Sequence, residues 1–286
     1  MDKKTVGWVN GFIGVVIFSG SLPATRVAVA GLDPLFLTCA RAGIAAIPAF
    51  LLLMLLRQPW PRSADLPALI VTSLGVVVGF PLLTALALQH ITSAHSIVFL
   101  GILPLCTAAF AVVRGGERPH PGFWLFSLLG SASVVLWAAL GDMAASLQGD
   151  LLMLAAVVVC GLGYAEGARL SRRLGGWQVI SWALVLSLPV MLPLLYIAWP
   201  ASFNDVDAAC WAGLAYVSLF SMLIGFVFWY RGLALGGIAA VGQLQLLQPF
   251  MALGLASVLL GETVDLTMIA VTLAAILCVV GARKYA

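Results

Sequence analysis

The second half of this chain repeats its first half, and the loop charges change sign between the two copies. The segment from Leu86, LALQHITSAHSIVFLGILPLCTAAFAVVRGGER, aligns with the segment from Arg231, RGLALGGIAAVGQLQLLQPFMALGLASVLLGET, at a constant shift of 145 residues. Pro104 falls on Pro249, and Gly116-Glu117 falls on Gly261-Glu262. A repeat of this length restricts the fold to two copies of one helical unit.

The charges around the repeated Gly-Glu predict that the two copies are inverted. Glu117 stands between Arg114 and Arg118, whereas Glu262 is followed by Asp265 and has no base beside it. An odd number of membrane spans in each copy would produce this reversal, because the second copy then enters the bilayer from the other side.

The composition requires a lipid environment. Apolar residues make up 63% of the chain, charged residues only 9%, and the mean hydropathy is +1.12. These values are typical of a polytopic membrane protein rather than a soluble globule. Apolar runs of about 20 residues, each long enough to cross the hydrocarbon core, occur about ten times. We expect spans at roughly 7–29, 34–56, 66–89, 93–113, 121–141, 149–169, 177–199, 208–230, 236–260 and 265–283.

The basic residues predict the orientation, because Lys and Arg near the ends of spans stay in the cytoplasm. Of the 14 bases, only Arg26 and Arg41 fall on the side that collects the loop aspartates. Both termini are therefore expected in the cytoplasm, and the net charge of +3 reflects topology rather than nucleic-acid binding. We expect the first apolar run to remain as a span rather than to be cleaved as a signal peptide.

At this point the chain resembles the drug/metabolite transporter superfamily, in its EamA-type branch. The pattern is two tandem units, each with a small-residue span, a proline and then Gly-Glu before the last helix. In this sequence these are Ala94, Pro104 and Gly116-Glu117, then Ala239, Pro249 and Gly261-Glu262. The resemblance covers nearly the whole chain and extends to the bacterial aromatic amino-acid exporters. It implies an all-α membrane protein of about ten helices, in two inverted five-helix repeats (residues 1–141 and 142–286) around a central cavity.

Polar groups within the spans are few, and each needs a partner or a purpose. Arg41 lies about 10 Å into the second span by helical rise, and we expect it to anchor at the periplasmic headgroups, with substrate binding as the alternative. Glu166 lies three residues before Arg169, which favours a local ion pair over a proton relay. His95, near the end of the fourth span, is expected to be interfacial.

The ninth span contains Gln243, Gln245 and Gln248, the densest cluster of amides in an apolar segment. On an α-helix Gln245 and Gln248 lie about 60° apart and share a face, whereas Gln243 points elsewhere. Both interhelical hydrogen bonds and the wall of a wet cavity are compatible with this pattern. Pro249 and its repeat mate Pro104 each remove a backbone hydrogen bond, so we expect matched bends or hinges at these positions.

Aromatic residues at membrane depth mostly fill space between helices or form interfacial belts, and Trp229-Tyr230 beside Arg231 is typical of a belt. Tyr164 and Phe99 are the better candidates for substrate contact, because their spans face the cavity in the family that the chain resembles. The predicted substrate-binding set is Gln245, Gln248, Tyr164, Phe99, Phe80 and Thr84. Glycine pairs with small-xxx-small spacing, Gly7/Gly11 and Gly232/Gly236 among them, would allow close helix contact.

The sequence contains none of the motifs of an enzyme, a metal site or a nucleotide-binding loop that we sought. The five cysteines have no metal-ligand spacing, so we expect neither a cofactor nor a metal. The resulting prediction is a secondary carrier of the bacterial inner membrane that exports small solutes, most of all amino acids including aromatic ones, by alternating access. A multidrug or nucleobase exporter of the same fold is the alternative. The expected partners are the solute and the lipid bilayer, without nucleic acid, and a monomer would suffice.

Overall fold

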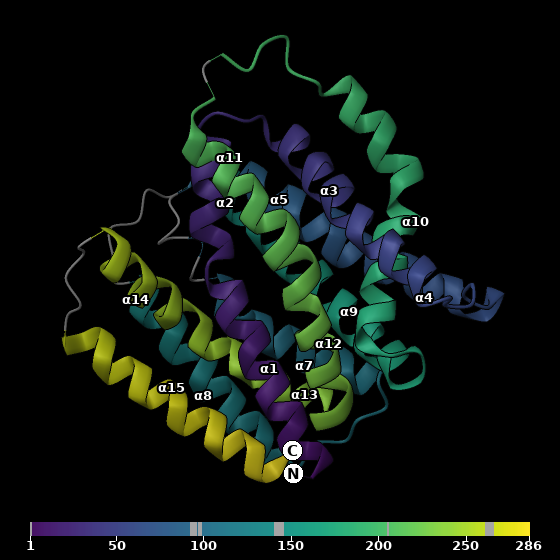
Figure 1. Cartoon of the computed structure of the whole chain (residues 1–286). Helices are drawn as coiled ribbons and strands as arrows, with labels where there is room; N and C mark the ends of the chain where they lie inside the picture. The colour runs from purple at the N-terminus through teal and green to yellow at the C-terminus, as the bar shows by residue number, and fades with distance from the viewer. Residues whose placement is uncertain (1, 92–95, 97–98, 140–145, 205, 261–265) are drawn as a thin grey trace.

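The computed structural model of the chain describes residues 2–91, 96, 99–139, 146–204, 206–260 and 266–286, and the regular structure in these ranges is helical throughout. Figure 1 shows the helices as a basket, with both chain termini at the same end. We call this the terminal end. There the guanidinium of Arg283 lies 4.9 Å from the ring centre of Trp8, which ties the last helix to the first.

The helices of the first half begin near the amino terminus and end at residue 139. They are α1 (Lys3–Ser19), α2 (Ser21–Val29), α3 (Pro34–Leu55), a 3₁₀ turn η1 (Ser63–Asp65), α4 (Leu66–Thr72), a π-helical segment η2 (Ser73–Gly79), α5 (Phe80–Ala87), α7 (Leu103–Val113) and α8 (Pro121–Ala139).

The helices of the second half follow in a similar order. They are α9 (Leu147–Leu174), α10 (Gly176–Ile197), α11 (Ala208–Ala215), a π-helical segment η3 (Tyr216–Ile224), α12 (Gly225–Gly236), α13 (Ile238–Gly242), a 3₁₀ segment η4 (Gln243–Leu247), α14 (Gln248–Leu260) and α15 (Leu266–Tyr285).

Local sequence signals explain several of the helix ends. Asp33 precedes Pro34 and accepts hydrogen bonds from the backbone N–H groups of Leu35 and Phe36, so it caps the start of α3. Asp207 caps α11 in the same way through the N–H of Cys210. Chain reversal between α9 and α10 occurs at Gly175, where φ is 99°, a conformation that glycine adopts without strain.

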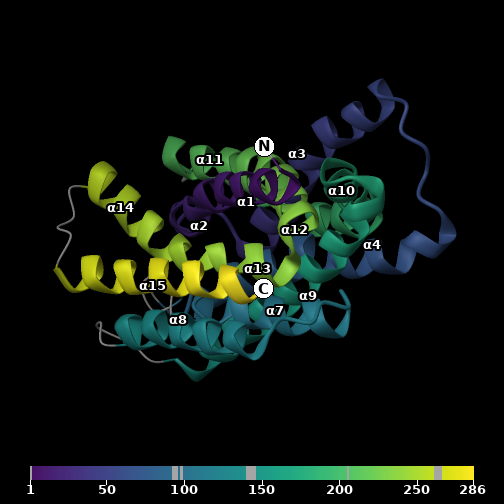
Figure 2. The same ribbon diagram turned by 90° about the horizontal axis from the view of Figure 1, so that it is seen from below.

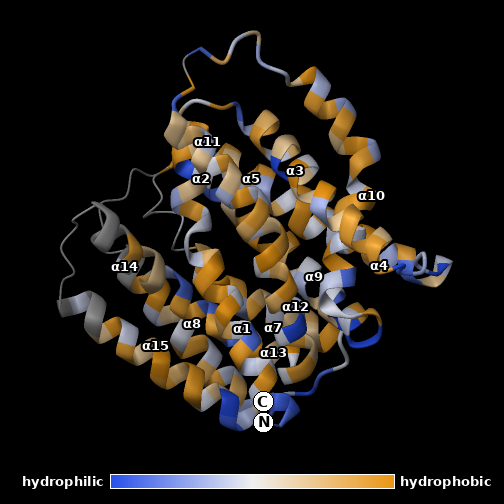
Figure 3. Ribbon diagram, viewed as in Figure 1, coloured by the Kyte–Doolittle hydropathy of each residue, from blue (hydrophilic) through white to orange (hydrophobic). Residues whose placement is uncertain are grey.

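The structure confirms a multi-pass membrane protein. Among the described residues, six continuous helical segments are long and apolar enough to cross a bilayer. Large apolar side chains on their outer faces are exposed to the surroundings, as Leu55 and Ile197 are, at 76% and 74%. Figure 3 shows that hydrophobic residues predominate along the helices. The other four expected spans are divided into shorter helices or include residues outside the described ranges, so a count of ten remains a prediction.

Helices that are far apart in sequence form the main contacts. α1 lies along α12, α3 along α10, α5 and α7 along α9, and α8 along α15. Figure 2 shows the last of these pairs running side by side. Close approach of α1 and α12 depends on glycine, since a Cβ on Gly7 would lie 2.4 Å from the backbone nitrogen of Gly236. The glycine pairs therefore mark true helix contacts.

Two π-helical segments occupy matching positions in the two halves. Adding the shift of 145 residues to Ser73–Gly79 gives residues 218–224, which end where η3 ends, at Ile224. Each segment continues directly into an α-helix, α5 in the first half and α12 in the second. Such segments are rare and are often found at functional sites. The sequence pattern gave no sign of them.

Candidate functional site

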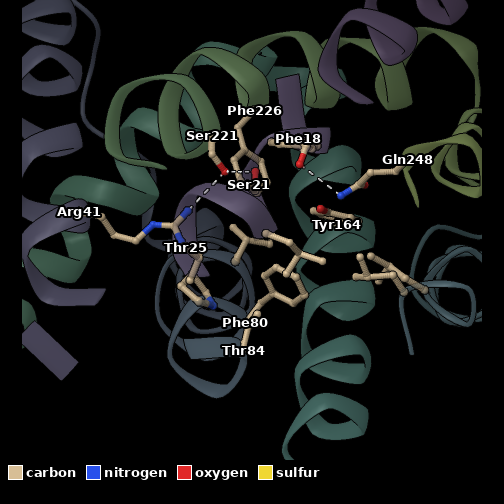
Figure 4. A pocket seen from close by; sticks show the side chains of 15 residues that line it. Phe18, Ser21, Thr25, Arg41, Phe80, Thr84, Tyr164, Ser221, Phe226 and Gln248 are labelled. Atoms are coloured by element: carbon tan, nitrogen blue, oxygen red, sulfur yellow. Dashed lines mark hydrogen bonds between the residues drawn. The ribbon is translucent and has the colours of Figure 1, made fainter. Parts of the chain in front are cut away.

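A narrow cavity lies between the two halves of the chain, and Figure 4 shows the 15 side chains that line it, ten of them labelled. Its wall comes from α1, α2, α3, η2, α5, α7, α9, η3, α12 and α14. The space open to the centre of a water molecule is about 40 Å³. This is enough for a few waters, so the walls must separate to admit an amino acid. The lining residues are Phe18, Ser21, Leu22, Thr25, Arg41, Val76, Phe80, Pro81, Thr84, Leu100, Leu103, Tyr164, Ser221, Phe226 and Gln248.

A break in the first span forms one side of this cavity. α1 ends at Ser19 and α2 begins at Ser21, because Pro23 lacks the N–H that would continue the helical ladder to Ser19. Two carbonyls before the break have side-chain donors: the Tyr216 hydroxyl bonds to the Ile17 carbonyl at 2.7 Å, and the Gln248 amide bonds to the Phe18 carbonyl at 3.3 Å. Irregular backbone at membrane depth is tolerated where protein satisfies it in this way.

Arg41 is the charged residue of the cavity wall. Its side chain extends from α3 toward the cavity (Figure 4) and is only 6% exposed. One guanidinium nitrogen, Nη2, donates to the Ser221 hydroxyl at 3.4 Å, and Nε has no hydrogen-bond partner. Ser221 also accepts from the Ser21 hydroxyl at 2.8 Å. The expectation that Arg41 anchors at the headgroups is therefore wrong, because its side chain turns inward.

Aromatic rings form the apolar part of the wall. The Phe226 ring lies 5.0 Å from that of Phe18 and 5.9 Å from that of Tyr164, both in edge-to-face geometry. Trp229 and Tyr230 lie behind this group and are fully buried. The Tyr230 hydroxyl donates to the Gly163 carbonyl, so the interfacial belt expected for these two residues is wrong.

Four of the six predicted substrate-binding residues line the cavity, namely Phe80, Thr84, Tyr164 and Gln248. The other two do not. Phe99 is partly buried against the cores near Ala87 and Met153, and Gln245 is buried in η4. Phe18 and Ser221 are lining residues that the sequence analysis did not select for this role, and Arg41 was given it only as an alternative. The break after Ser19 could have been anticipated from Gly20 and Pro23.

The glutamine cluster does not lie on a regular α-helix. Gln243 to Leu247 form a 3₁₀ turn, so the α-helical angles used to group Gln245 with Gln248 do not apply. Neither amide atom of Gln243 or Gln245 has a hydrogen-bond partner in the described part of the chain. Gln248 does line the cavity, but the α-helical spacing that paired it with Gln245 does not apply to this segment.

The two repeat prolines stand at equivalent points. Pro104 is the second residue of α7, and Pro249 is the second residue of α14. α14 follows a 3₁₀ turn, and the residues just before α7, Gly101 and Ile102, form a turn. Each proline thus lies in the first turn of a helix that follows an irregular segment, a position where its missing N–H is tolerated.

Ion pairs join helices at the terminal end of the cavity. The fully buried carboxylate of Glu166 pairs with Arg169 on its own helix at 2.7 Å, as the sequence predicted, and also with Arg114 at the end of α7. Glu117 pairs with Arg172 of α9 and accepts from the backbone N–H groups that begin α13. These contacts join α7, α9 and α13 on this side.

No group of three metal-binding side chains occurs in the ranges that the structure describes, and all five cysteines are free. Cys39, Cys160 and Cys210 are buried, and Cys106 and Cys278 partly so. His95 and the repeat residues Gly261 and Glu262 lie outside the described ranges.

Comparison with known proteins gives matches along the whole chain. The EamA-like transporter family matches residues 5–139 and again residues 147–283. An uncharacterized transporter, YdeK of Bacillus subtilis (strain 168), is 64% identical over 286 residues and covers 100% of both chains. A probable terminal-alkyne amino-acid exporter of Streptantibioticus cattleyicolor is 28% identical over 252 residues, covering 87% of this chain and 83% of its own. A solved crystal structure aligns with a TM-score of 0.76 at 19% identity, over 99% of this chain and 96% of its own.

Proposed function

The chain belongs to the EamA-like transporter family, and we propose that it is a secondary carrier that exports amino acids, aromatic ones included, by alternating access. The observation that supports this most is the central cavity, where one buried cation, an amide and several hydroxyls stand beside aromatic rings. These groups match the carboxylate, the polar head and the apolar side chain of an amino acid.

A relative's name supports the same solute class. The Streptantibioticus protein is named a probable exporter of a terminal-alkyne amino acid, and it aligns with most of this chain. A carrier of cationic drugs is a poorer match, because the charge on the described wall of the cavity is the positive charge of Arg41. We therefore rank amino-acid export above multidrug export.

The proposed architecture is ten spans in two inverted five-helix repeats, residues 1–141 and 142–286. The helix contacts support it, because the shift of 145 residues relates them to one another. The shift carries α1 onto α9 and α5 onto α12, so the contact of α1 with α12 matches the contact of α9 with α5. It also carries α3 onto α10 and α8 onto α15, and the two helices of each of these pairs lie along each other. The matched π-helical segments support it independently. We place the chain in the bacterial inner membrane with the terminal end in the cytoplasm, so the described conformation is closed toward the cytoplasm by its ion pairs.

Alternating access would use the same cavity from both sides. In an inverted repeat, exchanging the conformations of the two halves turns an inward-closed molecule into an outward-closed one. The ion pairs of Glu117 and Glu166 would then open, while the opposite end closes. Solute would be held near Arg41 and Gln248 in both states.

Transport by the purified protein tests this proposal. The protein in proteoliposomes loaded with unlabelled phenylalanine should accumulate labelled phenylalanine by exchange, and imposed proton or sodium gradients should reveal any coupling ion. Empty liposomes provide the background. If a panel of labelled amino acids, aromatic and aliphatic, exchanges no faster than the background, amino-acid transport is ruled out.

A further inference from the structure

We propose that Arg41 binds the carboxylate of the solute, and that the carrier selects solutes by this carboxylate and an apolar tail, without requiring an α-amino group. This inference rests on the proposed function and narrows its solute class to apolar monocarboxylates, of which aromatic amino acids are one kind.

The first step is that Arg41 has a buried charge without a counter-charge. A guanidinium has five N–H donors, and in the described structure Arg41 uses only one, in a long bond of 3.4 Å to Ser221. Taking an ion out of water costs several kcal/mol unless a partner of opposite charge replaces the lost hydration. An arginine held in this state at the wall of a cavity points to an anion that enters the cavity.

The second step is that the buried acids of the described chain are paired elsewhere. Glu166 is paired with Arg114 and Arg169, and Asp65 is paired with Arg173. Asp33, the exposed residue that caps the helix of Arg41, accepts from two backbone N–H groups at the start of that helix. The charge of Arg41 therefore remains available for a solute.

The third step concerns the kind of anion. A guanidinium matches a planar carboxylate with two parallel hydrogen bonds, and one positive charge balances one negative charge. A dianion such as phosphate would need a second cation. The other base on this side, Arg26, is exposed and directs Nη1 to the carbonyl of Ile91 at 3.5 Å. A monocarboxylate is the anion that the site balances.

The fourth step concerns the amine. Phe18, Phe80 and Phe226 offer a surface for an apolar tail, and the polar groups near them are neutral. Within the described residues that line the cavity, no carboxylate is present to pair with an ammonium group. The α-amino group thus gains no ion pair, and its removal should leave recognition largely intact.

Competition during labelled phenylalanine exchange tests the inference. 3-Phenylpropionate keeps the carboxylate and ring but lacks the amine, whereas 2-phenylethylamine keeps the amine and lacks the carboxylate. We expect the first to inhibit exchange about as well as unlabelled phenylalanine, and the second to inhibit at least about tenfold less, since a hydrogen bond to a charged group is the interaction lost. Strong inhibition by the amine alone, or none by the acid, would overturn the inference.

Two variants assign the effect to Arg41. Arg41→Gln should lose at least about tenfold in inhibition by 3-phenylpropionate, whereas Arg26→Gln, which removes an exposed base on the same side, should behave as the wild type. Equal inhibition of wild type and Arg41→Gln contradicts the inference. Because Arg41→Gln removes an unpaired buried charge, its thermal unfolding temperature should be no lower than that of the wild type.

A binding measurement separates this inference from the proposed function. Purified wild-type protein should be stabilised against heat by 3-phenylpropionate, and Arg41→Gln should not. If phenylalanine is not transported but this difference is found, amino-acid export fails and the carboxylate site stands. If phenylalanine is transported but 3-phenylpropionate stabilises both proteins equally, or neither, the carboxylate site fails alone.

Discussion

The carboxylate of Glu117 holds the start of the helix at Ala239, 122 residues further along the chain. Its Oε2 accepts the backbone N–H of Ala239 and its Oε1 accepts that of Ile238, both at 2.8 Å. The same carboxylate pairs with Arg172 of α9. A negative charge at a helix start is favourable, because the unpaired N–H groups there are donors with partial positive charge. One residue thus joins α9 and α13 at the terminal end.

The first prediction is that Glu117→Gln opens the terminal end more often. A glutamine accepts through one oxygen only, so it loses a charged hydrogen bond that contributes on the order of 1.5–3 kcal/mol. We expect a cysteine at Thr84, in the cavity wall of a cysteine-free background, to react about tenfold faster with a reagent added on the terminal side. Arg118→Gln is the control, because Arg118 is exposed and makes no ion pair in the described structure. Equal rates for the two variants would contradict the closing role of Glu117.

The membrane class and the pairing of Glu166 with Arg169 could be predicted from sequence because they depend on local quantities, namely hydropathy and helical spacing. The inward turn of Arg41 could not. An arginine that snorkels to the headgroups and an arginine buried at a cavity have the same sequence pattern. Which of the two Arg41 becomes depends on which face of α3 packs against η3. Arg114 was missed as a partner of Glu166 for the same reason, since the two lie on different helices.

The glutamine cluster shows a second limit. Gln248 reaches the cavity, but its neighbour Gln245 does not line it, because a 3₁₀ turn changes the angle between successive side chains. An argument from sequence periodicity assumes a single helix type, but the segment from α13 to α14 contains both α-helix and 3₁₀ helix. Gly7 and Gly236 each belong to a glycine pair with small-xxx-small spacing, which predicts close helix contact. The structure does bring these two glycines together where α1 meets α12.

The second prediction concerns this contact. In Gly7→Ala the new Cβ would lie 2.4 Å from the backbone nitrogen of Gly236, and a backbone atom cannot move aside as a side chain can. The two helices must separate, at a typical cost of about 1–3 kcal/mol for an overpacked site. The thermal unfolding temperature in detergent should fall.

Gly43→Ala is its matched control. A Cβ on Gly43 meets nothing within 4 Å, and alanine favours a helix over glycine by about 1 kcal/mol. This variant should unfold at the same temperature as the wild type or higher. Equal unfolding temperatures for the two variants would show that α1 and α12 are not held at the described distance.

The third prediction is that Gln248→Leu lowers transport while expression and folding stay near normal. Leucine removes the hydrogen bond to the Phe18 carbonyl and a polar group from the cavity wall. Phenylalanine exchange should slow about threefold to tenfold, the range for one neutral hydrogen bond of roughly 0.5–1.5 kcal/mol. Gln245→Leu should add to this loss if Gln245 faces solute in another conformation. Full activity of the double variant would leave both amides with a structural role only.

Gln243→Leu is the control for that measurement. Gln243 is fully buried, does not line the cavity, and has both amide atoms without a partner in the described structure. Leucine replaces an unsatisfied polar group there, so stability should be maintained or raised. A transport loss as large as that of Gln248→Leu would mean that any change in this segment disturbs the carrier.

The fourth prediction is the orientation. A cysteine at Ser202, which is exposed between α10 and α11, should react with an impermeant reagent added to intact cells. A cysteine at Ser63, in the turn η1, should react only after the membrane is opened. Gly175 is expected on the same inner side, but its φ of 99° makes a cysteine there strained, so Ser63 is the better probe. Ala145 is expected outside the cell and lies beyond the described ranges. Reaction at Ser63 in intact cells would reverse the topology.

The last prediction is that Pro104 and Pro249 are matched hinges. Each lies in the first turn of a helix that follows an irregular segment, and the two are related by the shift of 145 residues in halves that we propose to be inverted. Replacing either by alanine restores an N–H donor, which allows the helix to extend backward and stiffens the bend in its own half. In the proposed mechanism the two halves serve opposite sides of the pathway, so Pro104→Ala and Pro249→Ala should shift the inward/outward balance in opposite directions. The readout is the rate at which the Thr84 cysteine reacts from the periplasmic side.

Pro121→Ala, at the first residue of α8 and away from the cavity, should leave that rate unchanged. If both hinge variants shift the rate in the same direction, or neither does while transport continues, the prolines only shape the wall and the molecule must bend elsewhere, with η2 and η3 as the next segments to test.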